Sequence, residues 1–134
     1  MNNKFVCPSC RALLNVGDHI VFTAENSKKQ KGLLLLSTEL GNYQILHDPG
    51  FEYQSGDHVD CYCPVCNHNL GIPDVNEDLA EILMIDKNND QYKIIFSEVV
   101  GKNLTFKIKD NTIVESFGDD SDEFQNFWGA RPNY

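Results

Sequence analysis

The chain has little positive charge, a single tryptophan and no long apolar run. Its 134 residues hold 11 Lys and Arg against 20 Asp and Glu, a formal net charge of -9. A strongly acidic domain repels phosphate, so we expect no nucleic-acid partner. The run of leucines from Leu33 to Leu36 is far shorter than the roughly 20 apolar residues that cross a bilayer. We therefore expect no membrane span.

The N-terminal sequence also lacks an apolar signal region. It begins Met-Asn-Asn-Lys and reaches a cysteine at Cys7. We therefore expect a cytoplasmic protein. Five cysteines in such a chain favour a metal site over a disulfide framework, and the odd count fits four ligands and one spare thiol.

Four of the five cysteines occur in two Cys-Pro-x-Cys turns, here termed knuckles. The first knuckle holds Cys7 and Cys10, and the second holds Cys63 and Cys66. A CxxC turn directs two thiolates at one ion, and the proline stiffens the turn. The two knuckles together predict a closed, structural zinc site with four thiolate ligands. Iron in a rubredoxin-like centre takes the same ligands, and free thiols or local disulfides are a further alternative.

The spare thiol is Cys61, two residues before Cys63. In a strand the two side chains point to the same face, so Cys61 is a half-buried small residue beside the site, an alternative ligand or a redox thiol. A catalytic thiol needs a base or a cation to lower its pKa, and His58 and His68 are the nearest histidines in sequence. His68 is also a candidate donor to a cysteine sulfur. We expect no second cluster of metal ligands.

Frequent glycine, asparagine and aspartate residues divide the chain into short segments, as in a mainly β protein with little helix. Leu104, Phe106 and Ile108 alternate with polar residues, which indicates a strand with one buried face. Asp74 and Glu77 fit the first turn of one short helix. We expect strands over residues 19–24, 33–36, 43–46, 58–62, 81–86, 91–97, 103–109 and 112–117.

The charge and aromatic pattern divides the chain in two. Residues 1–118 are predicted to form the zinc-binding β domain, and residues 119–134 an acidic and aromatic C-terminal tail. No internal repeat is evident beyond the two knuckles.

The knuckles and the segment between them resemble the yippee-type domain of the β-tent superfamily, whose relatives include the thalidomide-binding domain of cereblon and B-type methionine sulfoxide reductases. The resemblance covers roughly residues 5 to 98. Gly32, Leu36, Asn42 and Gly56 keep the family's internal intervals, shifted by two residues relative to the first knuckle. Leu70-Gly71 follows the second knuckle as in the family, and Gln91-Tyr92-Lys93 resembles a downstream family motif in a looser register. The resemblance implies two antiparallel sheets pinned at their apex by zinc.

The chain departs from the family where ligands and catalysis are concerned. The family's Trp-Lys after the second knuckle is Ile72-Pro73 here, and the aromatic cage of cereblon-type domains needs several tryptophans where only Trp128 exists. The reductases carry a catalytic cysteine on a late strand, and no cysteine follows Cys66. We therefore expect a non-enzymatic module that binds an unknown protein or small molecule. The alternatives are a thiol or redox enzyme using Cys61 and an iron electron-transfer protein.

Overall fold

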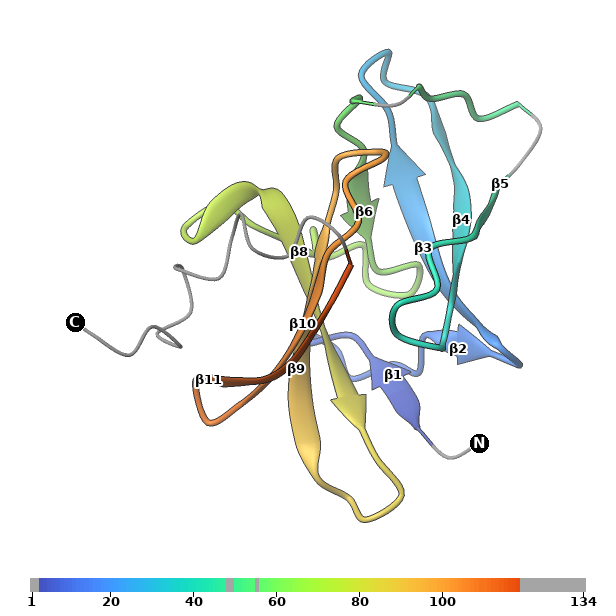
Figure 1. The fold of residues 1–134 in the computed structure, drawn as a ribbon. Helices are drawn as coiled ribbons and strands as arrows, with labels where there is room; N and C mark the ends of the chain where they lie inside the picture. The colour runs from blue at the N-terminus through green and yellow to red at the C-terminus, as the bar shows by residue number, and fades with distance from the viewer. Residues whose placement is uncertain (1–2, 48–49, 55, 119–134) are drawn as a thin grey trace, which may run out of the picture.

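The computed structural model describes residues 3–47, 50–54 and 56–118. Within these residues the chain forms strands and no helix (Figure 1). The predicted tail, residues 119–134, lies outside the described residues. The strands are β1 (Lys4–Val6), β2 (Asn15–Val16), β3 (His19–Glu25), β4 (Lys31–Ser37), β5 (Ile45–His47), β6 (Asp60–Tyr62), β7 (Gly71–Ile72), β8 (Asn76–Ile85), β9 (Gln91–Ser97), β10 (Thr105–Lys109) and β11 (Thr112–Phe117).

The strands form two antiparallel sheets, as the sequence predicts. A six-stranded sheet has the order β1-β8-β9-β10-β11, with β7 beside β8. A five-stranded sheet has the order β2-β3-β4-β5, with β6 beside β3. Figure 1 shows β3 and β4 in the upper right of the molecule and the long strands β8 and β9 in the lower left.

A core of apolar side chains joins the two sheets. Phe5, Ile82 and Met84 come from the six-stranded sheet, and Phe22 comes from the five-stranded one; all are at most 1% exposed. Side chains along β3 alternate between buried and partly exposed, so one face of that strand packs on the core. Burying each such side chain stabilises the fold by about 1.5–3 kcal/mol. The predicted burial of Leu104, Phe106 and Ile108 is confirmed, because each is 3% exposed or less. The expected exposure of the polar residues between them is wrong for Thr105, which is only 5% exposed.

The knuckles are the places where the chain passes from one sheet to the other. The first knuckle joins β1 of the six-stranded sheet to β2 of the five-stranded sheet. The second joins β6 of the five-stranded sheet to β7 of the six-stranded sheet. Each sheet therefore sends a strand into each knuckle, and a link between the knuckles holds both sheets together.

The segment from β1 to β4 and the segment from β6 to β9 are two copies of one unit. Each unit is a strand, a knuckle, a short strand and a long hairpin. The hairpin turns are built alike: the side-chain oxygen of Asn26 accepts N–H groups from Lys28 and Gln30, both at 3.0 Å. Asp86 accepts the equivalent N–H groups in the second unit at 2.9 and 3.0 Å. These local bonds fix the turn at the tip of each hairpin.

The two units exchange their first strands. Strand β1 pairs with β8 of the second unit, and β6 pairs with β3 of the first. The register of the two exchanged pairings also agrees. Phe5 lies opposite Met84 in the first pairing. Cys61, the counterpart of Phe5, lies opposite Ala24, the counterpart of Met84. The expectation of no repeat beyond the knuckles is therefore wrong. The repeat is evident in the backbone hydrogen bonds but not in the sequence, because many combinations of side chains are compatible with the same backbone pairing.

The short helix expected from Asp74 and Glu77 is also wrong. Residues 73–75 form a turn, in which the N–H of Val75 donates to the carbonyl of Ile72 at 2.9 Å, and β8 begins at Asn76. Strand β8 has partners on both sides, β1 and β9. The hydrogen bonds of that central position outweigh a local helix-capping pattern.

Candidate metal centre

The structure brings the four knuckle cysteines together at the junction of the two sheets. The Sγ atoms of Cys7, Cys10, Cys63 and Cys66 all lie within 4.8 Å of one another. Cys7 and Cys63 are buried, whereas Cys10 and Cys66 are exposed. Each knuckle thus contributes one inner and one outer thiol.

The sulfur spacing fits a single tetrahedral ion. Cys7 Sγ lies 3.8 Å from Cys66 Sγ, and Cys10 Sγ lies 3.8 Å from Cys63 Sγ. An ion about 2.3 Å from each of four sulfurs in a tetrahedron places those sulfurs about 3.8 Å apart. The distance is also far longer than the roughly 2.05 Å of a disulfide bond. The four residues can therefore hold a metal ion, and with four ligands in place no coordination position stays open.

Backbone N–H groups point at the inner sulfurs. Cys7 Sγ accepts from the N–H groups of Ser9 and Cys10 at 3.3 and 3.4 Å. Cys63 Sγ accepts the equivalent bonds from Val65 and Cys66 at the same two distances. Each knuckle closes through a residue with positive φ, Arg11 (+65°) and Asn67 (+64°). The knuckle backbone therefore stabilises negative charge on sulfur before any ion is bound.

The two inner thiols have different pKa values. Burial raises the pKa of Cys7, although the N–H groups of Cys10 and Ser9 oppose this. Burial acts in the same direction on Cys63, but there the N–H groups of Cys66 and Val65 and the neighbouring thiols prevail, and its pKa is lowered. A cation bound by these sulfurs would favour the thiolate form of all four cysteines.

Cys61 lies outside this group of four. It is only 3% exposed and belongs to the core cluster between the sheets. Burial, followed by the charges of Glu98 and Asp60, raises the pKa of its thiol well above the usual range. Cys61 is therefore a packed residue, more buried than expected, and a poor nucleophile.

His68 contacts the second knuckle through its backbone. Its carbonyl accepts the N–H of Cys63 at 3.0 Å, as the carbonyl of Ala12 does for Cys7. The side chain of His68 is exposed. The candidate hydrogen bond from its ring to a cysteine sulfur is not among the contacts of the described residues.

A second group of potential ligands lies beside β6, so the expectation of no second cluster is wrong. His58, Asp60 and Glu98 place one ligand atom each within 4.8 Å of one another. His58 and Asp60 are two residues apart at the start of β6, and Glu98 directly follows β9. A signal for the first two was present in their spacing, because residues i and i+2 of a strand share a face. Nothing local in the sequence links them to Glu98.

A cavity of about 120 Å³ lies between the two sheets. A single water needs only about 10–15 Å³ by this kind of measure, and an engineered cavity of about 150 Å³ holds benzene. Most of its walls are apolar side chains, and Cys61 and Glu98 also line it. The apolar walls include Phe22 and Leu36 from the five-stranded sheet and Ile82 and Phe96 from the six-stranded sheet.

Comparison with known proteins finds no matching family model, curated protein or solved structure. The yippee-type resemblance therefore stays a prediction from the residues that carry it. No helix of the described residues has both the length and the apolar character to span a membrane. Function has to be argued from the sites themselves.

Proposed function

We propose that the protein is a non-enzymatic binding module whose sheets are held together by one structural zinc ion. The observation that carries this proposal is the position of the four sulfurs, at tetrahedral spacing, where the chain crosses twice between the sheets. A four-thiolate shell leaves no position for a substrate, which is typical of structural zinc sites. The ion contributes its binding free energy to folding, because the unfolded chain has no preformed site.

The first test is metal analysis with a visible spectrum on the purified chain and on single Cys→Ser variants. We expect one colourless zinc per chain, with Cys7→Ser and Cys63→Ser losing it and melting at a lower temperature. Binding free energies near 10 kcal/mol support small zinc domains, so the drop should be large. Cys61→Ser is the matched control and should keep the metal, because Cys61 lies outside the group.

Other outcomes assign the site differently. One iron and a red colour would replace zinc by a rubredoxin-like centre and favour electron transfer. Full metal content and unchanged melting in Cys7→Ser would contradict the structural role. Loss of metal in Cys61→Ser would mean that the ligand set is wrong.

The burial of Cys61 argues against a thiol enzyme. A nucleophilic thiol needs a lowered pKa and access to substrate, and Cys61 has a raised pKa and is almost fully buried. The reactive thiol count under native conditions tests this. Zinc-loaded protein should show no fast-reacting thiol, and rapid modification of Cys61 would revive the enzyme alternative.

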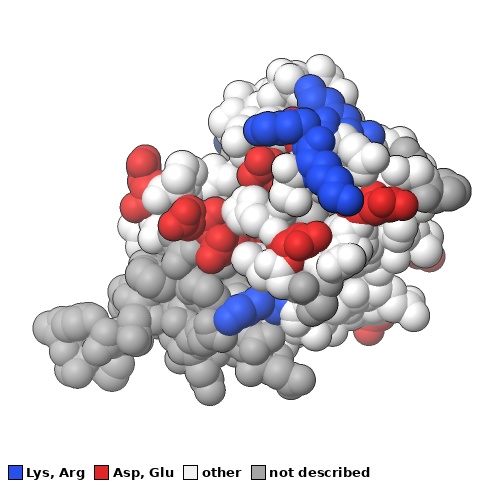
Figure 2. All heavy atoms as spheres, turned by 90° about the horizontal axis from the view of Figure 1, so that it is seen from above, with Lys and Arg blue, Asp and Glu red and all other residues white. Residues whose placement is uncertain are grey.

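The cavity between the sheets is the ligand site that this proposal assigns. Its size and apolar walls suit a small apolar molecule, with Glu98 as a polar group at its edge. The net charge of -9 disfavours a nucleic acid. Figure 2 shows most of the basic groups of one face gathered in a strip, with one basic group apart from it and acidic groups around it. Lys28 and Lys29 lie in the β3–β4 turn and Lys31 begins β4, and all three are exposed.

Calorimetry with benzene as the probe tests the cavity. We expect saturable binding to the zinc-loaded chain and loss of binding in Leu36→Trp, whose indole would fill the cavity. Leu33→Trp is the matched control, because Leu33 lies on the same strand but is 43% exposed and does not line the cavity. Equal binding by the two variants, or none by the wild type, would contradict the assignment.

A further inference from the structure

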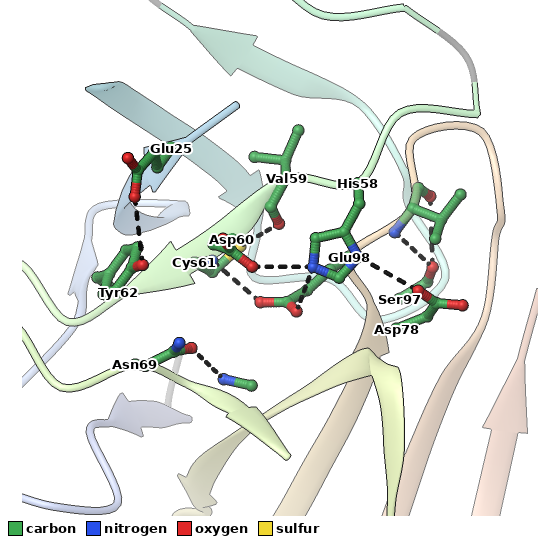
Figure 3. Close-up of polar contacts among 12 residues, drawn as sticks. Glu25, His58, Val59, Asp60, Cys61, Tyr62, Asn69, Asp78, Ser97 and Glu98 are labelled. Atoms are coloured by element: carbon green, nitrogen blue, oxygen red, sulfur yellow. Dashed lines mark hydrogen bonds and ion pairs between the residues drawn. The ribbon is translucent and has the colours of Figure 1, made fainter. Parts of the chain in front are cut away.

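The imidazole of His58 is surrounded by three carboxylates. Its Nε2 lies 2.9 Å from Asp60 Oδ1 and 3.3 Å from Glu98 Oε1. Its Nδ1 lies 3.2 Å from Asp78 Oδ1. Figure 3 shows the ring between these side chains, which come from the start of β6, from β8 and from the end of β9.

This arrangement requires a cation on the Nε2 side of the ring. A neutral imidazole has one N–H, and Asp78 is placed to accept it from Nδ1. The lone pair of Nε2 then faces the oxygens of Asp60 and Glu98. These electron-rich atoms repel one another unless a cation lies between them. The cation is either a proton, carried by the ring or by Glu98, or a metal ion. A carboxylate on the far nitrogen is the usual partner of a metal-binding histidine.

Glu98 is held so that one of its oxygens faces His58. Its side chain is 2% exposed, and its Oε2 accepts the N–H of Cys61 at 3.0 Å. The backbone of Glu98 is also fixed. Its N–H donates to the backbone carbonyl of Asp78 at 2.8 Å, and its own carbonyl accepts the N–H of Val59 at 2.9 Å. A buried ionised carboxylate is costly without a partner of opposite charge.

Comparison of the two units shows that this carboxylate replaces a neutral group. In the first unit the N–H of Phe5 donates to the amide oxygen of Asn15 at 2.9 Å. The counterparts of Phe5 and Asn15 in the second unit are Cys61 and Gly71, and Glu98 takes over the role of the amide. A Cβ on Gly71 would lie 3.4 Å from Glu98 Oε1. An amide is sufficient to accept this N–H, and the carboxyl group of Glu98 adds a second oxygen, Oε1, that faces His58.

We propose that His58, Asp60 and Glu98 form a second site, which binds a divalent transition-metal cation through one imidazole nitrogen and two carboxylates. This donor set suits Mn²⁺, Fe²⁺ or Zn²⁺. Its nitrogen and oxygen atoms are harder ligands than the four thiolates, and three ligands leave the coordination shell of the ion incomplete. Asp78 is a positioning residue, which orients the ring through Nδ1. The remaining coordination positions are open to water or to a ligand, and Glu98 also lines the cavity between the sheets.

A Mn²⁺ titration of the full chain with its thiolate site loaded with zinc, followed by electron paramagnetic resonance, tests the proposal. Mn²⁺ prefers oxygen and nitrogen donors, so it does not compete for the thiolates. We expect one bound Mn²⁺ per chain, with dissociation constants raised at least about tenfold in His58→Gln and Asp60→Asn. Asp78→Asn should weaken binding by about 10- to 100-fold without removing any ligand to the ion.

Matched controls separate this site from other causes. His19→Gln and Glu81→Gln change partly exposed residues outside the group and should bind Mn²⁺ as the wild type does. Glu98→Gln keeps an oxygen for the N–H of Cys61, so it should fold and hold zinc but bind Mn²⁺ at least about tenfold more weakly. No bound Mn²⁺ and no second zinc in the wild type would show that the group holds a proton in place of a metal ion and overturn the proposal. Equal binding by wild type and His58→Gln would overturn it too. Neither result bears on the thiolate centre, which is read out by its own zinc.

Discussion

At the scale of single residues, the group around His58 makes stability depend on pH. Burial raises the pKa of Glu98 to about 7, with the N–H of Cys61 and the charge of His58 opposing and the charges of Asp60 and Asp78 adding. Burial lowers the pKa of His58, but the charge of Glu98 and hydrogen bonds to Asp78 and Asp60 prevail and raise it above 6.5. Both groups therefore bind protons more tightly in the folded protein.

The sign of the effect follows from these directions. Glu98 keeps its proton in the folded state up to a pH of about 7, whereas the unfolded chain releases it near 4.5. The stabilisation from His58 is complete below pH 6.5 and is lost as the pH rises through its raised folded pKa. The free energy of unfolding therefore falls with rising pH, with Glu98 alone contributing about 1 kcal/mol between pH 6 and pH 8.

Urea denaturation of zinc-loaded protein at pH 6 and pH 8, without added Mn²⁺, measures this change. Glu98→Gln should show a smaller fall, and the difference between the two proteins cancels the titration of the thiols. Glu81→Gln serves as the control for a glutamate outside the group. An identical fall in wild type and Glu98→Gln would contradict the role of Glu98.

At the scale of strands and turns, local patterns predicted much and long-range pairing decided the rest. The hairpins around Asp110 and around Asn89 were predicted close to their observed bounds, because turn residues and alternating apolar side chains are local signals. The start of β8 was missed, although it pairs with the nearby β7 and with the end of β9, because Asp74 and Glu77 match a local helix-capping pattern. The four thiolates were found because each pair has a fixed local spacing. The His58 group was missed because Glu98 joins it only through the fold.

The prediction of Cys61 as a neighbour of the metal illustrates the same limit. The spacing correctly puts it in the strand that leads to Cys63. Whether that position faces the ion or the core depends on which strand lies opposite, here β3 with Ala24 as its partner. Sequence periodicity gives the two faces of a strand but not what covers each of them.

At the scale of the whole molecule, the exchange of β1 and β6 makes each half of the chain incomplete. The hairpin β3–β4 lacks the neighbour that β6 supplies, and the hairpin β8–β9 lacks β1. Each half also holds only two of the four thiolates. We therefore expect separate fragments 1–49 and 50–134 to form the native sheets only when mixed with each other and with zinc.

Circular dichroism and size-exclusion chromatography of the two fragments test this expectation. Mixing with one equivalent of zinc should give a 1:1 complex with the spectrum of the intact chain, and a chelator should dissociate it. A Cys7→Ser version of the first fragment is the control and should fail to assemble. A folded, monomeric fragment without its partner would show that one half specifies its own structure.

The matching of the two halves also bears on how such a protein arises. Two copies of a unit that exchange strands beside a shared group of four cysteines resemble the subunits of a strand-exchanged homodimer. An ancestor of half the length needs only one Cys-Pro-x-Cys turn, because dimerisation doubles it into a complete four-thiolate shell. Joining the copies in one gene then frees each half to diverge. The two halves differ at one such position. The first half uses Asn15 to accept a backbone N–H, whereas the second half has Gly71 there and uses the buried carboxyl group of Glu98. A homodimer could not have made this change in one subunit alone.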